Sequence, residues 1–311
     1  QLKSTGVILN IDSKNDEKNA IAGLNHQDGT LKPEDFIVIK ANWQPKSKNI
    51  LEIAQELNLG VDSLVFVDDN PAERAIINQQ IPNVSTPIME KPEKYIETID
   101  RAGYFEVVNL SKDDLKKSEM YKENMERNKV MASFDNYGDY LKSLDMHAKI
   151  EGFIPLYMAR IAQLTNKSNQ FNLTTKRYNQ TEIEEVEKDK NYITLYGKLT
   201  DTFGDNGVVS VVIGHMVGRI LEIDLWIMSC RVLKRDMEFA MMDALVREAK
   251  KAGIETIKGF YYPTAKNAMV KEFYAEQGFN KISEDEQGNT TWELDLTKKY
   301  ENKNKFIKME E

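Results

Sequence analysis

The sequence predicts an α/β protein of two domains, the first built on a parallel β-sheet and the second on a largely antiparallel one. Residues 6–77 alternate short apolar runs with amphipathic helical stretches, an order that is typical of a parallel sheet covered by helices. Residues 191–228 hold three successive segments in which apolar and polar residues alternate, as in an antiparallel meander. A length of 311 residues is enough for two hydrophobic cores.

The composition excludes several classes of protein. Hydrophobic residues make up 41% and charged residues 30%, which is typical of globular chains. A net charge of −8 argues against a nucleic-acid partner held by a basic face. There is one cysteine, so no internal disulfide forms, and no run of about 18 apolar residues occurs that would predict a membrane span. We therefore expect a cytoplasmic protein that does not bind a membrane.

The first domain is expected over residues 1–108. The segment GVILNIDSKND (6–16) predicts a buried strand that ends in a loop. NILEIAQELNLG (49–60) places apolar residues on one helical face, with Gly60 as the expected C-cap. SLVFVDDNPAERAII (63–77) predicts a strand, a tight turn and a helix. A charged stretch that lacks Gly and Pro follows, and it predicts an exposed helical linker over 109–143.

The second domain is expected over residues 144–297. In order, the patterns predict a strand at 146–152, helices at 155–171 and 180–189, strands at 191–201, 207–218 and 220–228, a long helix at 231–253 that Gly253 ends, a strand at 256–262, a helix at 267–277, and short strands near 279–282 and 290–296. Residues 298–311 are expected to form a frayed tail.

Two adjacent carboxylates, Asp68 and Asp69, follow the apolar run LVFV. Ligands bind at the carboxyl edge of parallel sheets, and carboxylate oxygens suit Mg²⁺. An alternative is a turn that forms without a metal, because Asn70 and Pro71 are a good N-cap and first-turn pair and Glu73 completes the helix start. The pair is therefore a candidate metal site on a turn that could also be purely structural.

Two further residues could meet a phosphate near the same edge. Ser13 closes the first strand and could donate a hydrogen bond, and Lys46 precedes a helix and could neutralise the charge. A loop serine and a surface lysine are usually no more than that. The order Ser, Lys, Asp-Asp along the chain is what makes the set informative.

Cys230 stands between the strand ILEIDLWIM and the predicted helix that begins near Arg231. Helix N-termini lower thiol pKa values. Arg231, Lys234 and Arg235 would oppose the helix dipole there, which indicates an anion such as a phosphate of CoA or of a carrier's pantetheine. The alternative for Cys230 is a small buried hydrophobe.

The order of these motifs resembles the haloacid dehalogenase superfamily, and their wording is similar to the FkbH-like proteins. SKND, NWQPKS and VFVDDNPAER carry the likeness in the first half, and AQLTNKSNQFNLTT, FGDNGVVSVVIG, MSCRVL and YYPTAKN carry it in the second. The resemblance implies a partial haloacid dehalogenase Rossmann-like parallel sheet, followed by an α+β Gcn5-related N-acetyltransferase-like domain. It also implies transfer of a glyceryl group from 1,3-bisphosphoglycerate to an acyl carrier protein through a thioester on Cys230.

The same resemblance implies roles for two residues of NAMVKEFYAEQGF. Asn267 would contact the pantetheine arm, and Tyr274 would protonate a leaving thiolate, although Phe273 and Tyr274 could instead be core aromatics. The family's phosphate turn has the pattern Arg/Gln-x-x-Gly-x-Gly/Ala. Lys234 and Asp236 stand in place of both glycines, which counts against CoA and favours the phosphopantetheine of a carrier.

The resemblance also places an Asp-x-Asp-x-Thr motif with the aspartate nucleophile upstream of Val7, outside the given sequence. We therefore expect this polypeptide to bind Mg²⁺ poorly and to lack phosphatase activity. The main hypothesis is an acyltransferase that acts on a carrier thiol. The alternatives are a non-catalytic module that binds a carrier protein or partner, and a CoA-dependent N-acyltransferase.

Two polar stretches leave a structural and a functional interpretation open. Asp205 and Asn206 in FGDNG favour a turn. The amides Asn169, Gln170 and Asn172 could line a polar pocket or cap a helix.

Overall fold

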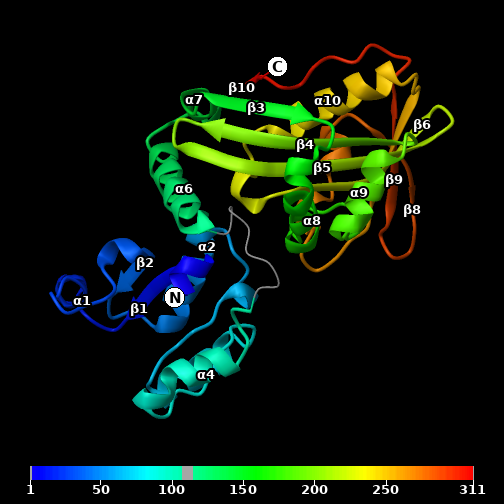
Figure 1. Ribbon diagram of the computed structural model, residues 1–311. Helices are drawn as coiled ribbons and strands as arrows, with labels where there is room; N and C mark the ends of the chain where they lie inside the picture. Colours follow the sequence, from blue (N-terminus) through cyan, green and yellow to red (C-terminus); the bar gives the residue numbers. More distant parts are fainter. Residues whose placement is uncertain (1, 107–114, 311) are drawn as a thin grey trace. The chain divides into compact units, whose positions relative to one another are not determined.

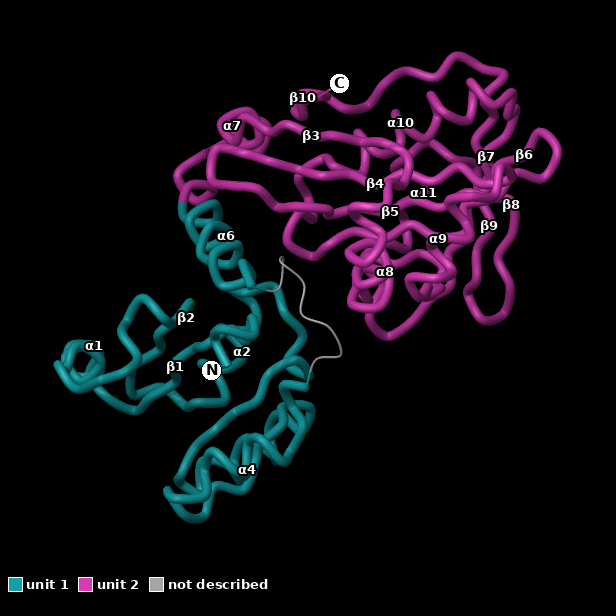
Figure 2. Tube along the Cα trace, in the orientation of Figure 1, with its two compact units in different colours: residues 1–129 teal, residues 130–311 magenta. Residues whose placement is uncertain are grey.

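The computed structural model describes residues 2–106 and 115–310, and the chain divides into two compact units, residues 1–129 and 130–311 (Figure 2). The boundary falls inside helix α6 (Lys117–Met131) and within the predicted linker 109–143, of which residues 109–114 lie outside the described residues. The N-terminal part of α6 is not simply solvated. Tyr121 is buried against Val38, Ile53 and Leu57 of the first unit.

The first unit contains the predicted parallel α/β arrangement (Figure 1). Strands β1 (Leu9–Ser13) and β2 (Phe36–Ala41) pair in parallel, and an isolated parallel bridge joins Val65 to Ser85. The helices are α1 (Glu17–Leu24), α2 (Lys46–Leu57), α3 (Pro71–Gln80) and α4 (Tyr95–Arg101). The parallel strand pair with its helices agrees with the α/β arrangement predicted for the first domain.

Helix α2 shows how local sequence sets these elements. Its apolar face is buried as the spacing predicts. The predicted C-cap at Gly60 is wrong, because Asn58 ends the helix in the left-handed conformation with φ 52°. The predicted start of α3 is confirmed: the Asn70 side chain accepts a hydrogen bond from the Ala72 N–H, and Pro71 is the first helical residue.

The second unit is built on one sheet of eight strands, in the order β10-β3-β4-β5-β6-β7-β9-β8. The strands are β3 (Met146–Glu151), β4 (Tyr192–Asp201), β5 (Gly204–Val217), β6 (Ile220–Met228), β7 (Thr256–Tyr261), β8 (Asn280–Glu284), β9 (Thr290–Asp295) and β10 (Ile307–Met309). Strands β3 to β6 are antiparallel neighbours, which confirms the predicted meander. Strands β6 and β7 run parallel.

The two faces of this sheet carry separate cores because successive strand residues point to opposite faces. Val209 of β5 packs with Ala240 and Met241 of α10 (Met237–Lys251), whereas its neighbour Val208 packs with Ile161 of α8 (Met158–Lys167). The remaining helices are α7 (Tyr137–Ser143), α9 (Gln180–Lys188) and α11 (Phe273–Glu276). The unit has the predicted α+β architecture, with helices on both faces of a largely antiparallel sheet.

The expectation of a frayed tail over residues 298–311 is wrong for its described part. Ile307–Met309 forms β10, which pairs in parallel with β3 (Figure 1). The Asp243 carboxylate on α10 accepts hydrogen bonds from the Tyr300 hydroxyl and from the backbone N–H groups of Lys303 and Asn304. These contacts hold the C-terminal segment on the unit. Over residues 2–106 and 115–310, no helix combines the length and apolar character of a membrane span.

Candidate functional site

In the first unit the structure brings together two of the predicted site residues. The Lys46 ammonium contacts the Asp68 carboxylate, with 2.5 Å between Nζ and Oδ2. The other Asp68 oxygen accepts the Asn70 N–H at 2.8 Å, and 6% of the side chain is exposed. Ser13 ends β1 half-buried, and no hydrogen bond within the described part of the chain joins its hydroxyl to Lys46 or Asp68.

The predicted Mg²⁺ ligands do not form a site that fits the ion. Asp69 is exposed, and both oxygens of Asp68 already have partners. Across residues 2–106 and 115–310, no three His, Cys, Asp or Glu side chains gather so that they could hold a metal. Mg²⁺ prefers two or more oxygen ligands in near-octahedral geometry, which these residues do not offer.

Asp12 is a buried carboxylate that the sequence patterns did not single out. Its Oδ1 accepts from the Asn49 amide at 2.8 Å, while Oδ2 is buried with no hydrogen bond from any described residue. Burial raises the pKa of Asp12 to about 6, although Asn49 and Lys46 favour the charged form. Its place directly before Ser13, at the end of a strand, was the available signal.

In the second unit Cys230 lies half-buried just beyond the carboxyl end of β6. The predicted helix start near Arg231 is wrong. Cys230–Val232 is one short 3₁₀ turn, and α10 begins only at Met237, because Lys234 and Asp236 adopt left-handed conformations that interrupt the helix. The dipole of α10 is therefore not the source of any thiol activation.

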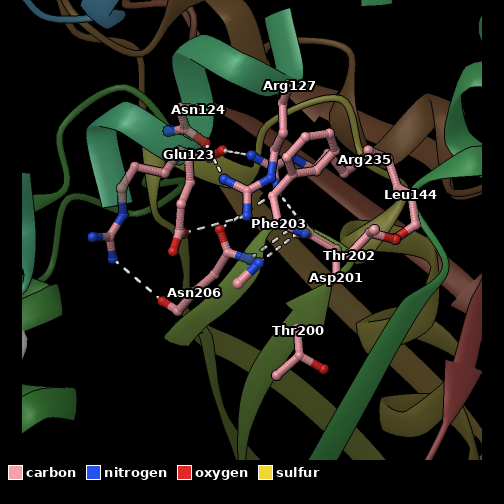
Figure 3. A network of polar contacts seen from close by, with 12 residues as sticks. Glu123, Asn124, Arg127, Leu144, Thr200, Asp201, Thr202, Phe203, Asn206 and Arg235 are labelled. Carbon is pink, nitrogen blue, oxygen red and sulfur yellow. Dashed lines mark hydrogen bonds and ion pairs between the residues drawn. The ribbon is translucent and has the colours of Figure 1, made fainter. Parts of the chain in front are cut away.

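The cations near Cys230 have a different role from the predicted one. Arg235 is buried and pairs with Asp201, whose side chain is 0% exposed, at 3.0 Å between Nη1 and Oδ2 (Figure 3). Asp201 also accepts from the backbone N–H groups of Phe203 and Gly204 at the β4–β5 turn. The anion predicted for Arg235 is thus an internal carboxylate.

The other two cations differ from Arg235 in exposure. Arg231 donates to the backbone oxygen of Asn206 at 3.4 Å and to the Ser229 hydroxyl at 3.3 Å. Only Lys234 of the three is exposed. The turn predicted at Asp205 and Asn206 is wrong, because both residues lie in β5, where the Asp205 carboxylate accepts the Gly207 N–H at 2.7 Å. Through Arg231, the loop that follows β6 is tied to the start of β5.

Lys234 and Asp236 occupy the two positions where the family pattern has glycine. Their φ angles are 64° and 61°, in the left-handed region that glycine favours. The turn thus keeps the backbone path of a glycine-rich loop with other residue types. Glu238 follows in the first turn of α10, and burial raises the pKa of its carboxyl to about 7. Acidic groups, rather than a free anion site, occupy this helix start.

Asn267 is not placed to contact a pantetheine arm. The side chain is 0% exposed, and its amide nitrogen donates to the backbone oxygens of Asn172 and Tyr262, both at 2.9 Å. Its oxygen accepts the Thr264 N–H at 2.7 Å and, more weakly, the Tyr261 hydroxyl at 3.5 Å. Every hydrogen-bonding position of the amide is in use, so the predicted ligand contact is corrected to a structural one.

Tyr274 is a core residue in this structure. Its side chain is 0% exposed and lies where a Cβ at Gly259 would stand, 2.2 Å from the nearest ring atom. The hydroxyl has no hydrogen bond of acceptable geometry to a described residue, and burial raises the pKa of Tyr274. The predicted role as an acid would need a hydroxyl that reaches the thiolate, which this position does not provide.

The strands β6 and β7 pair only over Ile220–Glu222 and Thr256–Lys258 and then diverge. Residues 171–174, here called the wedge segment, lie in the gap. An antiparallel bridge joins Asn172 to Ile227 of β6. The side-chain oxygen of Asn172 accepts a hydrogen bond from the Thr175 N–H at 2.9 Å, and the side-chain oxygen of Asn169 accepts one from the Arg177 guanidinium. These two amides stabilise turns in place of the pocket considered above.

Comparisons with known proteins find partial likenesses. No family model matches the chain. No curated protein matches it either. The ribosomal-protein-S18-alanine N-acetyltransferase of Escherichia coli is 14% identical over 50% of this chain and 99% of its own, with a TM-score of 0.38. The spermidine N-acetyltransferase of Vibrio cholerae, solved with CoA and spermine, is 12% identical over 49% of this chain and 96% of its own, with a TM-score of 0.40.

A third solved structure resembles a different part of the prediction. It is the N-terminal part of a Bacteroides fragilis protein that contains a phosphatase domain, in complex with Mg. The identity is 38% over 35% of this chain, with a TM-score of 0.33. The match spans 29% of that protein chain.

Proposed function

We propose that this chain is an FkbH-like acyltransferase that carries an acyl group, a glyceryl group in the first instance, as a thioester on Cys230. The observation that carries the proposal is the position of Cys230, the single cysteine of the chain. It lies half-buried at the end of β6, on a loop that is tied to the neighbouring hairpin by the buried pair Asp201–Arg235 and by Arg231. A thiol held in this way suits covalent catalysis better than it suits a core position.

The chemistry requires two acyl transfers. In the first, the Cys230 thiolate attacks the acyl carbon of an acyl phosphate such as 1,3-bisphosphoglycerate, a C–S bond forms, and the C–O bond to phosphate breaks. In the second, the phosphopantetheine thiolate of an acyl carrier protein attacks the thioester, and Cys230 leaves as a thiolate. Thiolates attack and leave readily, so each step needs little more than correct positioning.

An acidic carrier protein would meet fewer exposed cations beside Cys230 than the three that the sequence places there. Arg235 is buried with Asp201, so Lys234 is the exposed cation of the predicted trio. We propose that Lys234 contributes to the rate of carrier association more than to the affinity, as charges at an interface rim do.

Intact mass spectrometry tests the proposal directly. The full chain is incubated with 1,3-bisphosphoglycerate, and we expect one glyceryl adduct that hydroxylamine removes, as it removes thioesters. Cys230→Ser and Cys230→Ala should remain unmodified, while Lys234→Ala, the matched control on the same loop, should be acylated like the wild type. An adduct on Cys230→Ala would overturn the assignment.

The same measurement separates the alternatives. A non-catalytic binding module would bind the carrier but give no adduct. A CoA-dependent N-acyltransferase would not be acylated by 1,3-bisphosphoglycerate. It would instead transfer the acyl group of an acyl-CoA to an amine. The buried position of Tyr274 disfavours that alternative, because the hydroxyl assigned as its acid is not accessible to a leaving thiolate.

A further inference from the structure

We infer that a pantetheine arm, whether from CoA or from a carrier, does not enter the sheet of the second unit, because the wedge segment fills the gap between β6 and β7. Acyl donor and acceptor must then reach Cys230 from outside the sheet. The inference deepens the proposed function, on which its statement about the route to Cys230 rests.

The gap between two diverging parallel strands is a place where an amide-bearing ligand could bind. Backbone N–H and C=O groups on the facing edges lose their partners there, and buried groups of this kind must be paired. Here the chain pairs them itself. The Leu173 N–H donates to the Trp226 oxygen at 3.3 Å, and the Met228 N–H donates to the Phe171 oxygen at 3.2 Å. On the opposite side the Tyr262 N–H donates to the Leu173 oxygen at 2.9 Å.

The side chains of the wedge segment belong to the core. Phe171, Asn172, Leu173 and Thr174 are all buried, with exposures between 0% and 6%. The Phe171 ring packs edge-on against Phe273 at 5.3 Å between centroids. An arm that displaced the segment would expose the apolar side chains of Phe171 and Leu173 to water, which opposes displacement.

Two side chains lock the segment from its ends. Asn267 donates to the Asn172 backbone oxygen at 2.9 Å from its fully buried amide. The Thr174 hydroxyl donates to the Asp224 backbone oxygen at 2.6 Å. Removal of the segment would leave the Asn267 amide unsatisfied in the core, a cost that a ligand would have to offset.

The charges near the start of α10 also disfavour the binding of CoA. A CoA pyrophosphate would need cations or free N–H groups at a helix N-terminus. The residues there are Asp236 and the largely buried Glu238, and Arg235 is paired with Asp201, so Lys234 is the exposed cation of this turn. One exposed cation beside two carboxyl groups disfavours the pyrophosphate of free CoA.

Hydrogen–deuterium exchange of the full chain tests the inference, with CoA and pantetheine as the probes. We expect a peptide covering residues 169–176 to exchange as slowly as peptides of β5, with or without either probe, and we expect titration calorimetry to show no saturable binding of CoA. Rapid exchange of this peptide, or exchange that CoA accelerates there, would overturn the inference. So would saturable CoA binding that protects residues 223–228.

Two variants show that the peptide responds when the lock is opened. Asn267→Ala should speed exchange in 169–176 by at least about tenfold and leave β5 unchanged, since local opening is governed by local contacts. Thr174→Val removes only the bond to Asp224 and should give a smaller effect, which keeps the test decisive if Asn267→Ala fails to fold. Unchanged exchange in Thr174→Val and in folded Asn267→Ala would refute the lock.

Failure of this inference and failure of the proposed function look different. If CoA changes the exchange of the wedge segment while Cys230 is acylated normally, the inference alone is refuted. If no acyl adduct forms while the wedge segment stays protected, the proposed function is refuted and the inference that the gap is closed still holds.

Discussion

Polar side chains near Cys230 form ion pairs and hydrogen bonds with one another, and these contacts limit the role that each side chain can have. Asp201 and Arg235 form a buried pair, with 0% and 7% of their side chains exposed. Asn206, also buried, contacts both. A buried charge is expensive when it loses its partner, so these residues act as positioning groups for the loop that bears Cys230.

Arg235→Ala should lower the free energy of unfolding of the second unit by about 3–5 kcal/mol, because the buried Asp201 carboxylate would lose the guanidinium that lies 3.0 Å from it. Urea unfolding followed by tryptophan fluorescence measures the change. Lys234→Ala, one residue away and exposed, is the matched control and should change stability by less than about 0.5 kcal/mol. An equal effect of the two substitutions would show that the pair does not stabilise the fold.

Among single residues, sequence patterns identified local roles better than distant ones. Asn70 and Pro71 were identified as a helix start because an N-cap acts on the next three residues. Asn267 was assigned to a ligand, yet its partners are backbone groups, one of them 95 residues away in the chain. No local pattern marks such a partner.

At the level of elements, helix α10 shows how burial can disfavour the charged form of a carboxyl group in the first turn of a helix. Asp and Glu are favoured in a first turn by the helix dipole. Glu238 is nevertheless largely removed from water, and one of its carboxylate oxygens has no hydrogen bond from a described residue. Burial consequently raises the pKa of Glu238 from 4.5 to about 7.

This shift has a defined sign in the dependence of stability on pH. The folded state binds the Glu238 proton more tightly than the unfolded state, so this residue lowers stability as the pH rises from about 4.5 to 7. Glu238→Gln should therefore raise the free energy of unfolding by about 1–3 kcal/mol at pH 8, with a smaller gain at pH 5. Thermal or urea unfolding at both pH values measures the difference.

Glu248→Gln on the same helix is the control of opposite sign. Hydrogen bonds from Arg247 and Lys251 lower the pKa of Glu248 despite some burial, so its charge favours folding above about pH 4.5. The substitution should cause a slight loss of stability at pH 8. A gain in both variants would contradict the assignment for Glu238.

Helices and strands with one apolar face were predicted well. The start of a helix was predicted poorly where it depends on the backbone conformation of single residues. The amphipathic spacing of α2 and the alternation of apolar and polar residues in β4 to β6 are local patterns, and the structure has the helix and the strands that they predict. The break before α10 depends on left-handed residues at Lys234 and Asp236, and the residue types do not reveal it, because only the glycines of the family pattern mark these two positions.

At the scale of the whole molecule, each unit has its own hydrophobic core, and the second unit draws its C-terminal segment onto the sheet. Asp243 of α10 accepts three hydrogen bonds from residues 300–304, and β10 follows. One carboxylate thus connects a helix to an edge strand that is about 60 residues further along.

Asp243→Ala should release this segment. We expect faster deuterium exchange over residues 298–310 and a loss of about 2–3 kcal/mol in unfolding free energy, because three donors lose a charged acceptor. Asp295→Ala, at an exposed carboxylate on β9, is the control and should leave exchange at β10 unchanged. Persistent protection of residues 307–309 in Asp243→Ala would mean that pairing with β3 alone holds the strand.

The sequence by itself determined the order of the two units, most strands and helices, and the residue types near each candidate site. These follow from periodicity, caps and turns, which act over a few neighbouring residues. Tertiary structure alone decided that Arg235 faces Asp201, 34 residues away, that Asn267 locks Asn172, and that the gap beside β6 is closed. The reason is physical: buried polar groups must be paired, and their partners are whichever groups the fold brings near, whatever their distance along the chain.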